Sequence, residues 1–112
     1  MNTQAMQQKT FTERVIDIIR EIPPGKVATY GGIAERAGNP RAARQVARVL
    51  HSSSRKRGLP WHRVINKQGR IALKDQGYER QKALLEAEGI YLDLKGNVDL
   101  EEYLWNPIGG LI

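Results

Sequence analysis

The first regular pattern in the chain is a helical repeat of apolar residues that follows a polar N-terminal stretch. Thr10 and Glu13 have the spacing of a capping box, in which a hydroxyl and a carboxylate bind the free amides of a first helical turn. Apolar side chains then recur at helical spacing, at Phe11, Val15, Ile18, Ile19 and Ile22. Pro23-Pro24-Gly25 cannot continue a helix, so the pattern predicts a core helix that stops there.

Two further helices are predicted after a short extended step at Val27-Ala28. Thr29 can cap the first of them, and its inward positions are Ile33, Ala34 and Ala37, with Gly38 as its stop. Asn39-Pro40 predicts the start of the next helix, because Asn is a strong N-cap and Pro suits the first helical position. The buried face of this helix is expected to consist of Ala43, Val46, Ala47 and Leu50.

The opposite face of this third helix is basic. Its neighbouring positions are Arg41, Arg44, Gln45 and Arg48. No Asp or Glu occurs from Pro40 to Ser54, and Arg55-Lys56-Arg57 continues the basic run into what we expect to be a loop. A solvated helix face is the ordinary alternative, but such faces usually mix charges of both signs. Two short helices joined by a glycine-containing turn therefore predict a helix-turn-helix whose arginines meet DNA.

The second half of the chain predicts a small β wing and one more helix. Residues 59–65, a turn at 66–69 and residues 70–72 have the pattern of a strand, turn and strand. A helix from about Tyr78 to Glu88 should turn Ala83, Leu84 and Ala87 inward and stop at Gly89. We expect the later apolar residues, with Tyr103 and Trp105 among them, to pack on the domain; a partner surface is the alternative.

Length and composition narrow the class of protein. The 112 residues suit one domain, which we place at 10–112 after a flexible tail at 1–9. The formal net charge of +6 favours anionic partners, nucleic acid first. The sequence has no cysteine, so it has neither disulfides nor thiolate chemistry. No signal peptide, membrane span, metal site or cofactor motif is evident, so we expect an intracellular protein.

Trp61 occupies a setting that otherwise suits a nucleophile, within Pro60-Trp61-His62-Arg63-Val64-Ile65. An indole has neither an acidic proton near neutral pH nor a reactive lone pair, so it cannot perform covalent catalysis. It can stack on a flat ligand. The motif therefore indicates a binding site in which the chemistry of a related reaction has been lost.

Three motifs in order carry a resemblance to a known family: residues 22–30 (IPPGKVATY), residues 37–44 (AGNPRAAR) and residues 60–65 (PWHRVI). From about Phe11 to Gly89 the chain resembles the C-terminal DNA-binding and active-site domain of the O6-alkylguanine-DNA alkyltransferases. In those enzymes a cysteine stands at the position of Trp61 and accepts the alkyl group from a flipped guanine. Tryptophan in its place is typical of the alkyltransferase-like proteins, which bind the lesion without repairing it. The fold implied is a mainly α, winged helix-turn-helix domain.

The resemblance implies a role for each matching residue. Arg44 would enter the base stack in place of the extruded nucleotide, and Tyr30 would press on the phosphate 3' to it. Ala42 and Ala43 would let the helix approach the groove, and Arg41, Gln45 and Arg48 would contact backbone or base edges. The lesion pocket would consist of Pro60, Trp61, Tyr30 and Arg44.

His62 and Glu88 match the residues that activate the cysteine in the enzymes. With nothing to activate, we expect them to form a buried structural pair, with Arg63 also paired internally. Two departures from the family pattern are evident. Ser53, within residues 51–54, stands where the enzymes have an asparagine in the turn ahead of the nucleophile, and residues 73–78 are unlike the enzymes' glycine-rich pocket loop.

The leading hypothesis is a non-enzymatic sensor that flips O6-alkylguanine from duplex DNA into a pocket beside Trp61. The resemblance implies nucleotide excision repair proteins as partners, and we expect a monomer, in the cytoplasm or nucleoid of a bacterium or the nucleus of a eukaryote. A sequence-specific helix-turn-helix regulator is the alternative. A weaker one is an enzyme in which His62 and Glu88 activate water.

Overall fold

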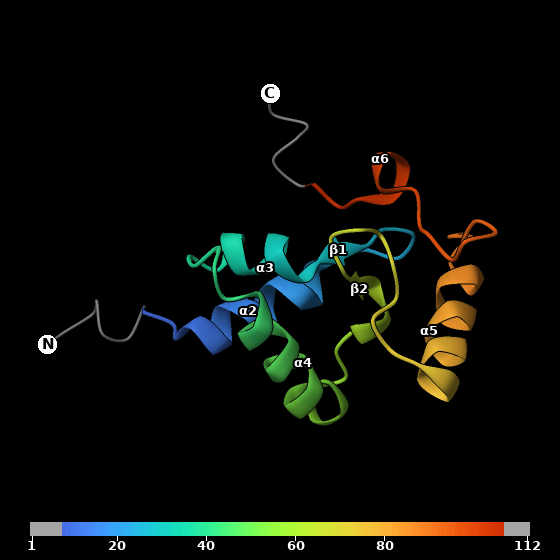
Figure 1. The fold of residues 1–112 in the computed structure, drawn as a ribbon. Coiled ribbons are helices and arrows are strands. Elements are labelled where there is room, and N and C mark those ends of the chain that lie inside the picture. Colours follow the sequence, from blue (N-terminus) through green and yellow to red (C-terminus); the bar gives the residue numbers. More distant parts are fainter. Residues whose placement is uncertain (1–7, 107–112) are drawn as a thin grey trace, which may run out of the picture.

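The computed structural model describes residues 8–106; most of the expected tail, residues 1–7, and residues 107–112 lie outside the described part. The elements are α2 (Phe11–Glu21), β1 (Ala28–Thr29), α3 (Tyr30–Arg36), α4 (Ala43–Arg57), the 3-10 helix η1 (Trp61–Arg63), β2 (Val64–Ile65), α5 (Asp75–Ala87) and α6 (Leu100–Tyr103). In Figure 1, α2, α3 and α4 pack together on one side, α5 stands on the other, and β1 and β2 lie between them. No helix within residues 8–106 is long and apolar enough to cross a membrane.

The first helix forms as its sequence predicts. The Thr10 hydroxyl accepts a hydrogen bond from the Glu13 amide at 3.0 Å, and the Glu13 carboxylate accepts one from the Thr10 amide at 2.8 Å. This capping box satisfies two amides of the first turn. The buried face of α2 consists of Val15, Ile16 and Ile19, and it packs against α3 and α4. Of the expected inward positions, Phe11 and Ile18 are only half-buried.

The helix-turn-helix is confirmed, but the bounds of its second helix differ from the prediction. Asn39 does not cap a helix; its side chain accepts from the Arg41 amide and its carbonyl from the Ala42 amide, which closes a turn. The helix α4 therefore begins at Ala43, and it continues to Gly58, whose φ of +61° ends it. Arg55–Arg57, expected in a loop, form its last turn.

The later start also corrects the predicted buried face of α4. Val46, Val49 and Leu50 are buried, whereas Ala43 is half-buried and Ala47 is exposed. The helix has its buried stripe on the side that faces α2 and α3, and Ala47 lies outside that stripe. The exposed small side chain leaves room beside α4 that a larger residue would fill.

The predicted β wing is replaced by a different pairing. Residues 61–63 form η1, and β2 pairs in parallel with β1, with Ala28 opposite Val64 and Thr29 opposite Ile65. The stretch 70–72 forms no strand with β2; a hydrogen bond from the Asn66 amide to the Arg70 carbonyl closes the turn, and Arg70 instead bridges to Asn97. Val64 and Ile65 are buried, so this short strand belongs in the interior and not in an exposed wing.

The last long helix, α5, begins at Asp75 and not at Tyr78, and the residues on its buried face differ from those predicted. Gln81 and Leu85 are the buried residues of α5, whereas Ala83 and Ala87 are exposed and Leu84 is half-buried. Leu85 joins a second core cluster with Val27, Ile65, Ile71, Ile90 and Val98. The first core cluster lies among α2, α3 and α4 and includes Val15, Ile33 and Val46. Trp105 packs on this first cluster, as expected, but Tyr91 is 64% exposed.

Candidate nucleic-acid interface

A groove of about 900 Å³ lies between α4 and α5, and Trp61 of η1 is part of its lining. Tyr30, at the start of α3, and Trp61, in η1, both line it, together with the apolar side chains of Leu50, Leu59 and Leu73. The fold thus brings together Tyr30 and Trp61, which are far apart in the sequence. Burial raises the pKa of Tyr30, so its phenol stays protonated and can donate a hydrogen bond.

Pro60 positions Trp61 without lining the groove itself. The Pro60 backbone, at φ −76° and ψ 66°, is the centre of a tight turn in which the Trp61 amide donates to the Leu59 carbonyl at 2.8 Å. The indole packs partly on the first core cluster and stands edge-on to the His62 ring, with centroids 6.2 Å apart. One part of the indole is thereby fixed while another part remains open to the groove.

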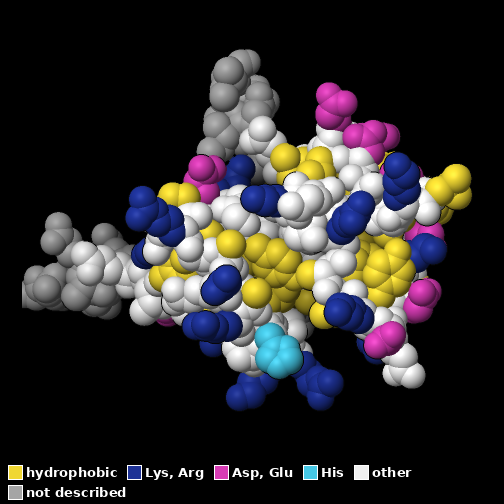
Figure 2. Space-filling model, in the orientation of Figure 1, with side chains coloured by type: hydrophobic (Ala, Val, Ile, Leu, Met, Phe, Trp, Pro, Cys, Tyr) yellow, Lys and Arg dark blue, Asp and Glu magenta, His cyan; other side chains and the backbone are white. Residues whose placement is uncertain are grey.

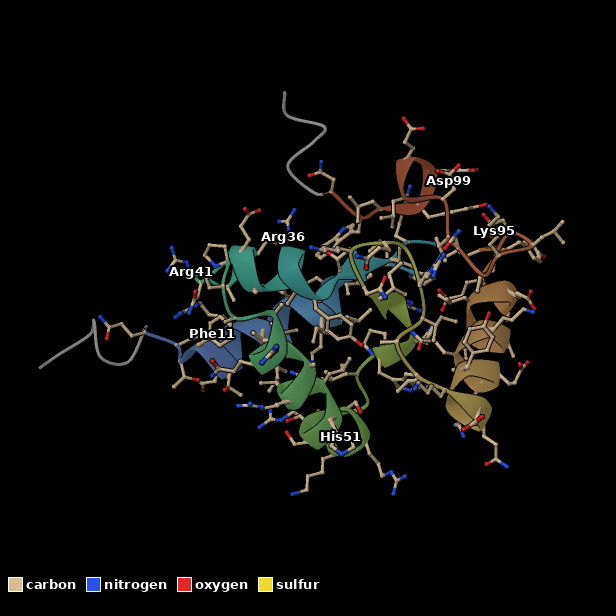
Figure 3. All side chains as sticks on the ribbon, in the orientation of Figure 1. Phe11, Arg36, Arg41, His51, Lys95 and Asp99 are labelled. Carbon is tan, nitrogen blue, oxygen red and sulfur yellow. The ribbon has the colours of Figure 1, made fainter. Side chains whose placement is uncertain are left out.

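The exposed face of α4 is rich in arginine, has no acidic residue and leads into the groove. Arg44, Gln45 and Arg48 are exposed, and Arg41 is exposed in the turn that precedes the helix (Figure 3). Arg44 does not line the groove; it lies about one helical turn before Ala47 and two turns before His51, which do. Ala42 is 8% exposed and Ala43 half-buried, so their contribution to the surface is small.

Charge on this face of the molecule is arranged around an apolar centre. Figure 2 shows Lys and Arg side chains around yellow hydrophobic ones, with acidic side chains mostly toward the upper and right edges. The groove contributes further cations that the sequence did not assign to a pocket, namely Arg55 and Lys56 from α4 and Arg80 from α5. Such a surface suits a nucleic acid. The cations can neutralise backbone phosphates, while the apolar centre can contact a flat base.

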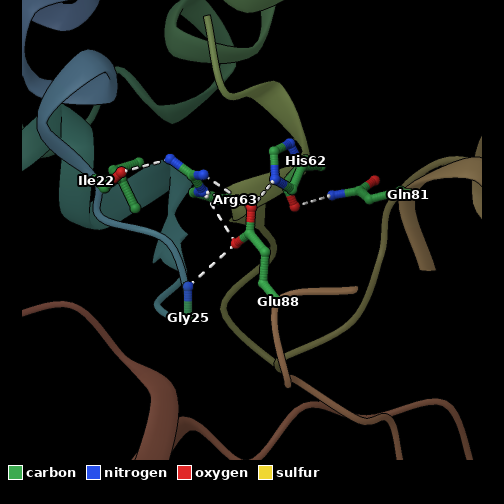
Figure 4. Close-up of polar contacts among 6 residues, drawn as sticks. All are labelled: Ile22, Gly25, His62, Arg63, Gln81 and Glu88. Carbon is green, nitrogen blue, oxygen red and sulfur yellow. Dashed lines mark hydrogen bonds and ion pairs between the residues drawn. The ribbon is translucent and has the colours of Figure 1, made fainter. Parts of the chain in front are cut away.

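His62 and Glu88 form the contact that we predicted, within a larger cluster (Figure 4). The His62 Nε2 lies 2.7 Å from a Glu88 carboxylate oxygen, and the Glu88 side chain is 16% exposed. Arg63 donates to both Glu88 oxygens, and its Nη1 donates to the Ile22 carbonyl at 2.8 Å. The Gly25 amide also donates to Glu88. The carboxylate therefore connects η1, α5 and the loop after α2.

The electrostatics of this cluster favour the ionised form of Glu88 at neutral pH. Burial acts to raise the pKa of Glu88, but hydrogen bonds from Arg63, His62 and Gly25 outweigh this effect. The net result is a pKa lowered from 4.5 to about 2. Arg63 is thus paired internally, as predicted. A carboxylate engaged by three partners is suited to hold the turn that presents Trp61.

Gln81 is a site residue that sequence reasoning missed. Its side-chain amide donates to the His62 and Val64 carbonyls, each at 3.0 Å, and it lines the groove. The sequence did contain a signal for its burial, because Tyr78, Gln81 and Leu85 lie on one helical face. The alanines of α5 favoured a different face as the buried one. Ser53 shows the opposite error: it lies inside α4, half-buried, and not in a turn ahead of Trp61.

Comparison with known proteins identifies the family of this fold. Residues 10–90 match the model of the 6-O-methylguanine DNA methyltransferase DNA-binding domain. The chain belongs to that family. Its similarity to alkyltransferase-like members extends further along the chain: it is 44% identical over 108 residues to alkyltransferase-like protein 1 of Schizosaccharomyces pombe, covering 91% of this chain and 100% of that protein.

Two further matches connect the family to DNA. The chain is 45% identical over 100 residues to the DNA base-flipping protein of Escherichia coli, covering 89% of this chain and 78% of that protein. Its structure is similar, with a TM-score of 0.75 and 42% identity, to the crystal structure of S. pombe Atl1 in complex with damaged DNA containing O6-carboxymethylguanine. That match covers 89% of this chain and 100% of the Atl1 chain, and it supports the predicted helix-turn-helix fold class.

Proposed function

We propose that this protein is a non-enzymatic sensor of O6-alkylguanine that flips the damaged base out of duplex DNA into the groove beside Trp61. The observation that carries the proposal is the position of Trp61: a partly fixed indole lines a groove with both apolar and cationic side chains, next to a basic helix, in a chain without cysteine. The similarity to a base-flipping protein and to Atl1 bound to damaged DNA supports it.

In this proposal the residues divide the work of extrusion and capture. Arg44 lies outside the groove and on its DNA-facing approach, so it fills the space that the flipped base leaves; its flat guanidinium can stack and donate hydrogen bonds there. Tyr30 presses on the neighbouring phosphate, and Arg41, Gln45 and Arg48 hold the backbone or base edges. Trp61 receives the base, while Glu88 keeps its turn in place through His62 and Arg63.

The energetics favour a damaged base. Extrusion costs a few kcal/mol, and less for an alkylated guanine that pairs poorly. Stacking on an aromatic side chain returns about 1–3 kcal/mol. Because no cysteine accepts the alkyl group, the complex is reversible and the lesion remains in the DNA. The function of the bound protein is then to mark the damage for other proteins.

Binding measurements test this proposal. Fluorescence anisotropy with matched duplexes that contain guanine or O6-methylguanine should show tighter binding to the lesion, regardless of flanking sequence, with one protein per lesion. Equal affinity for the two duplexes would contradict the proposal. A preference for one undamaged sequence, read by a dimer, would instead identify a helix-turn-helix regulator.

A chemical assay tests the absence of catalysis. Duplex DNA carrying a radiolabelled O6-methyl group should retain all of its label after long incubation with the protein. An active alkyltransferase of the same family serves as the positive control. Release of label to solvent would show that His62 and Glu88 activate water, and label on the protein would show an acceptor other than cysteine.

We also propose that the bound lesion is handed to nucleotide excision repair, in the compartment that holds the DNA. The reversibility of the complex supports a handover, because binding alone removes no damage. A reconstituted excision nuclease should incise an O6-methylguanine duplex faster when this protein is added, and an undamaged duplex should show no change. Equal incision of the damaged duplex with and without the protein would refute the handover.

A further inference from the structure

Helix α3 forms part of another concavity, a pocket of about 400 Å³ that is separate from the groove. β1, α3 and the segment 104–106 supply its walls, and no described residue lines both the pocket and the groove. Tyr30, at the start of α3, lines the groove, whereas Gly32 and Arg36, further along the same helix, line the pocket. A base held in the groove would therefore leave this pocket free for a second partner.

The wall formed by residues 104–106 is largely apolar and is held in place by its backbone. The Val27 amide donates to the Tyr103 carbonyl at 2.9 Å, and the Trp105 amide donates to the Val27 carbonyl at 2.7 Å. Leu104 is 39% exposed in this wall, and the Arg36 guanidinium lies 5.3 Å from the centroid of the Trp105 ring. A pocket whose walls are already fixed loses little conformational entropy when it is filled. It suits an apolar side chain as its occupant.

The edge of this pocket is acidic. Glu35 lines the pocket and is exposed. Helix α6, which ends directly before Leu104, adds three exposed carboxylates, those of Asp99, Glu101 and Glu102. In Figures 1 and 2, acidic side chains gather at the upper edge of the molecule, where α6 lies. Residues 86–106 contain six acidic residues and one basic residue, in a chain whose formal net charge is +6. This edge therefore attracts a cationic partner, opposite in sign to the DNA.

We infer that the pocket binds a basic segment of the repair protein that takes over the lesion, with an apolar side chain of that segment inserted beside Trp105. This inference rests on the proposed function. A protein that acts on the same DNA carries cations of its own for the phosphates. The arginines of α4 repel such a surface, whereas the carboxylates of α6 and Glu35 attract it. The pocket thus provides a docking site for the partner while the groove still holds the base.

The test uses two variants of the pocket and a matched control for each. Leu104→Ala removes an apolar wall, and Leu94→Ala, at a fully exposed leucine outside the pocket, is its control. Glu101→Lys reverses a charge beside the pocket, and Glu21→Lys, at an exposed position of α2, makes the same charge change elsewhere. Each protein is added at saturation to an O6-methylguanine duplex, so that differences in lesion affinity drop out. A reconstituted excision nuclease is then titrated, and the nuclease concentration for half-maximal incision is measured.

Leu104→Ala and Glu101→Lys should need at least about fivefold more nuclease than the wild type, as expected for the loss of an interface anchor or of a charge match. Both controls should need as much as the wild type. All four variants should still prefer O6-methylguanine to guanine. Unchanged incision with folded Leu104→Ala and Glu101→Lys overturns the inference; if Leu104→Ala does not fold, Glu101→Lys, at an exposed position, decides.

The same proteins reveal other occupants of the pocket. If Leu111→Asp, in the segment 107–112 that follows Asn106, lowers the melting temperature and is not additive with Leu104→Ala, the chain itself fills the pocket and the inference is wrong. A wild-type dimer that Leu104→Ala dissociates would also overturn it. A wild type that prefers O6-methylguanine to guanine without accelerating incision refutes this inference and leaves the sensor function intact. A wild type without that preference refutes the sensor function.

Discussion

The indole of Trp61 cannot act as a nucleophile, but it offers a flat surface for binding. It is held by the turn at Pro60 and by contacts with the first core cluster, and it lines the groove. We expect Trp61→Ala to weaken binding to an O6-methylguanine duplex roughly tenfold to hundredfold, because base stacking on an aromatic contributes about 1–3 kcal/mol. Trp61→Phe should retain part of the affinity for the lesion, because a phenyl ring can also stack on the base. Anisotropy titrations check this, and unchanged lesion affinity in a folded Trp61→Ala protein would refute a stacking role.

Arg44 and Arg48 offer a matched comparison on the exposed face of α4. If Arg44 fills the space of the flipped base, Arg44→Ala should bring the affinities for damaged and undamaged DNA close together. Arg48→Ala should weaken both affinities by a similar factor, because a phosphate contact carries no information about the lesion. Arg44→Lys should not restore the preference, since an ammonium cannot stack. The same preference in Arg44→Ala and the wild type would exclude this role.

At the scale of elements, Glu88 joins three segments that are distant in sequence. Its folded-state pKa of about 2 lies below the ordinary 4.5, so its ionised form stabilises the fold above pH 4.5, and this is lost as the pH falls toward 2. At about 1.4 kcal/mol per pH unit the contribution is about 3 kcal/mol at neutral pH. Glu88→Gln should lose about this much and show a weaker dependence on acid.

Chemical denaturation at neutral pH and at several acidic pH values checks the Glu88 prediction. Glu79→Gln, on the exposed side of the same helix, is the control and should behave like the wild type. If Glu88→Gln and the wild type unfold at the same denaturant concentration at neutral pH, the cluster does not stabilise the fold as its geometry implies.

The elements also show which features a sequence can predict. The Thr10–Glu13 cap was predictable because its hydrogen bonds join residues three positions apart. The inward face of α5 was not predictable, because the buried side chain of Gln81 is stabilised by hydrogen bonds to the His62 and Val64 carbonyls. These two residues are 17 or more positions away in the sequence. β2 has two residues, too few for an alternating pattern. In the site, motif spacing gave Tyr30 and Trp61, whereas Gln81 required the three-dimensional structure.

At the scale of the whole molecule, two core clusters support the two walls of the groove. One lies under α2, α3 and α4, and the other holds α5 and the segments after it. Arg55, Lys56 and Arg80 line this groove, while Asp99, Glu101 and Glu102 lie at α6, away from it (Figures 1 and 2). This separation of charge should orient the protein with the groove toward DNA before any base is flipped.

The salt dependence of binding distinguishes backbone contacts from lesion recognition across the whole interface. If about five phosphates are neutralised, raising the salt from about 50 to 200 mM should lower both affinities roughly 500-fold. The preference for O6-methylguanine over guanine should stay nearly constant, because stacking on Trp61 and the insertion of Arg44 release few counterions. Titrations of both duplexes at four salt concentrations measure the two slopes. A preference that disappears with salt would show that the lesion is recognised through charge and not through the groove.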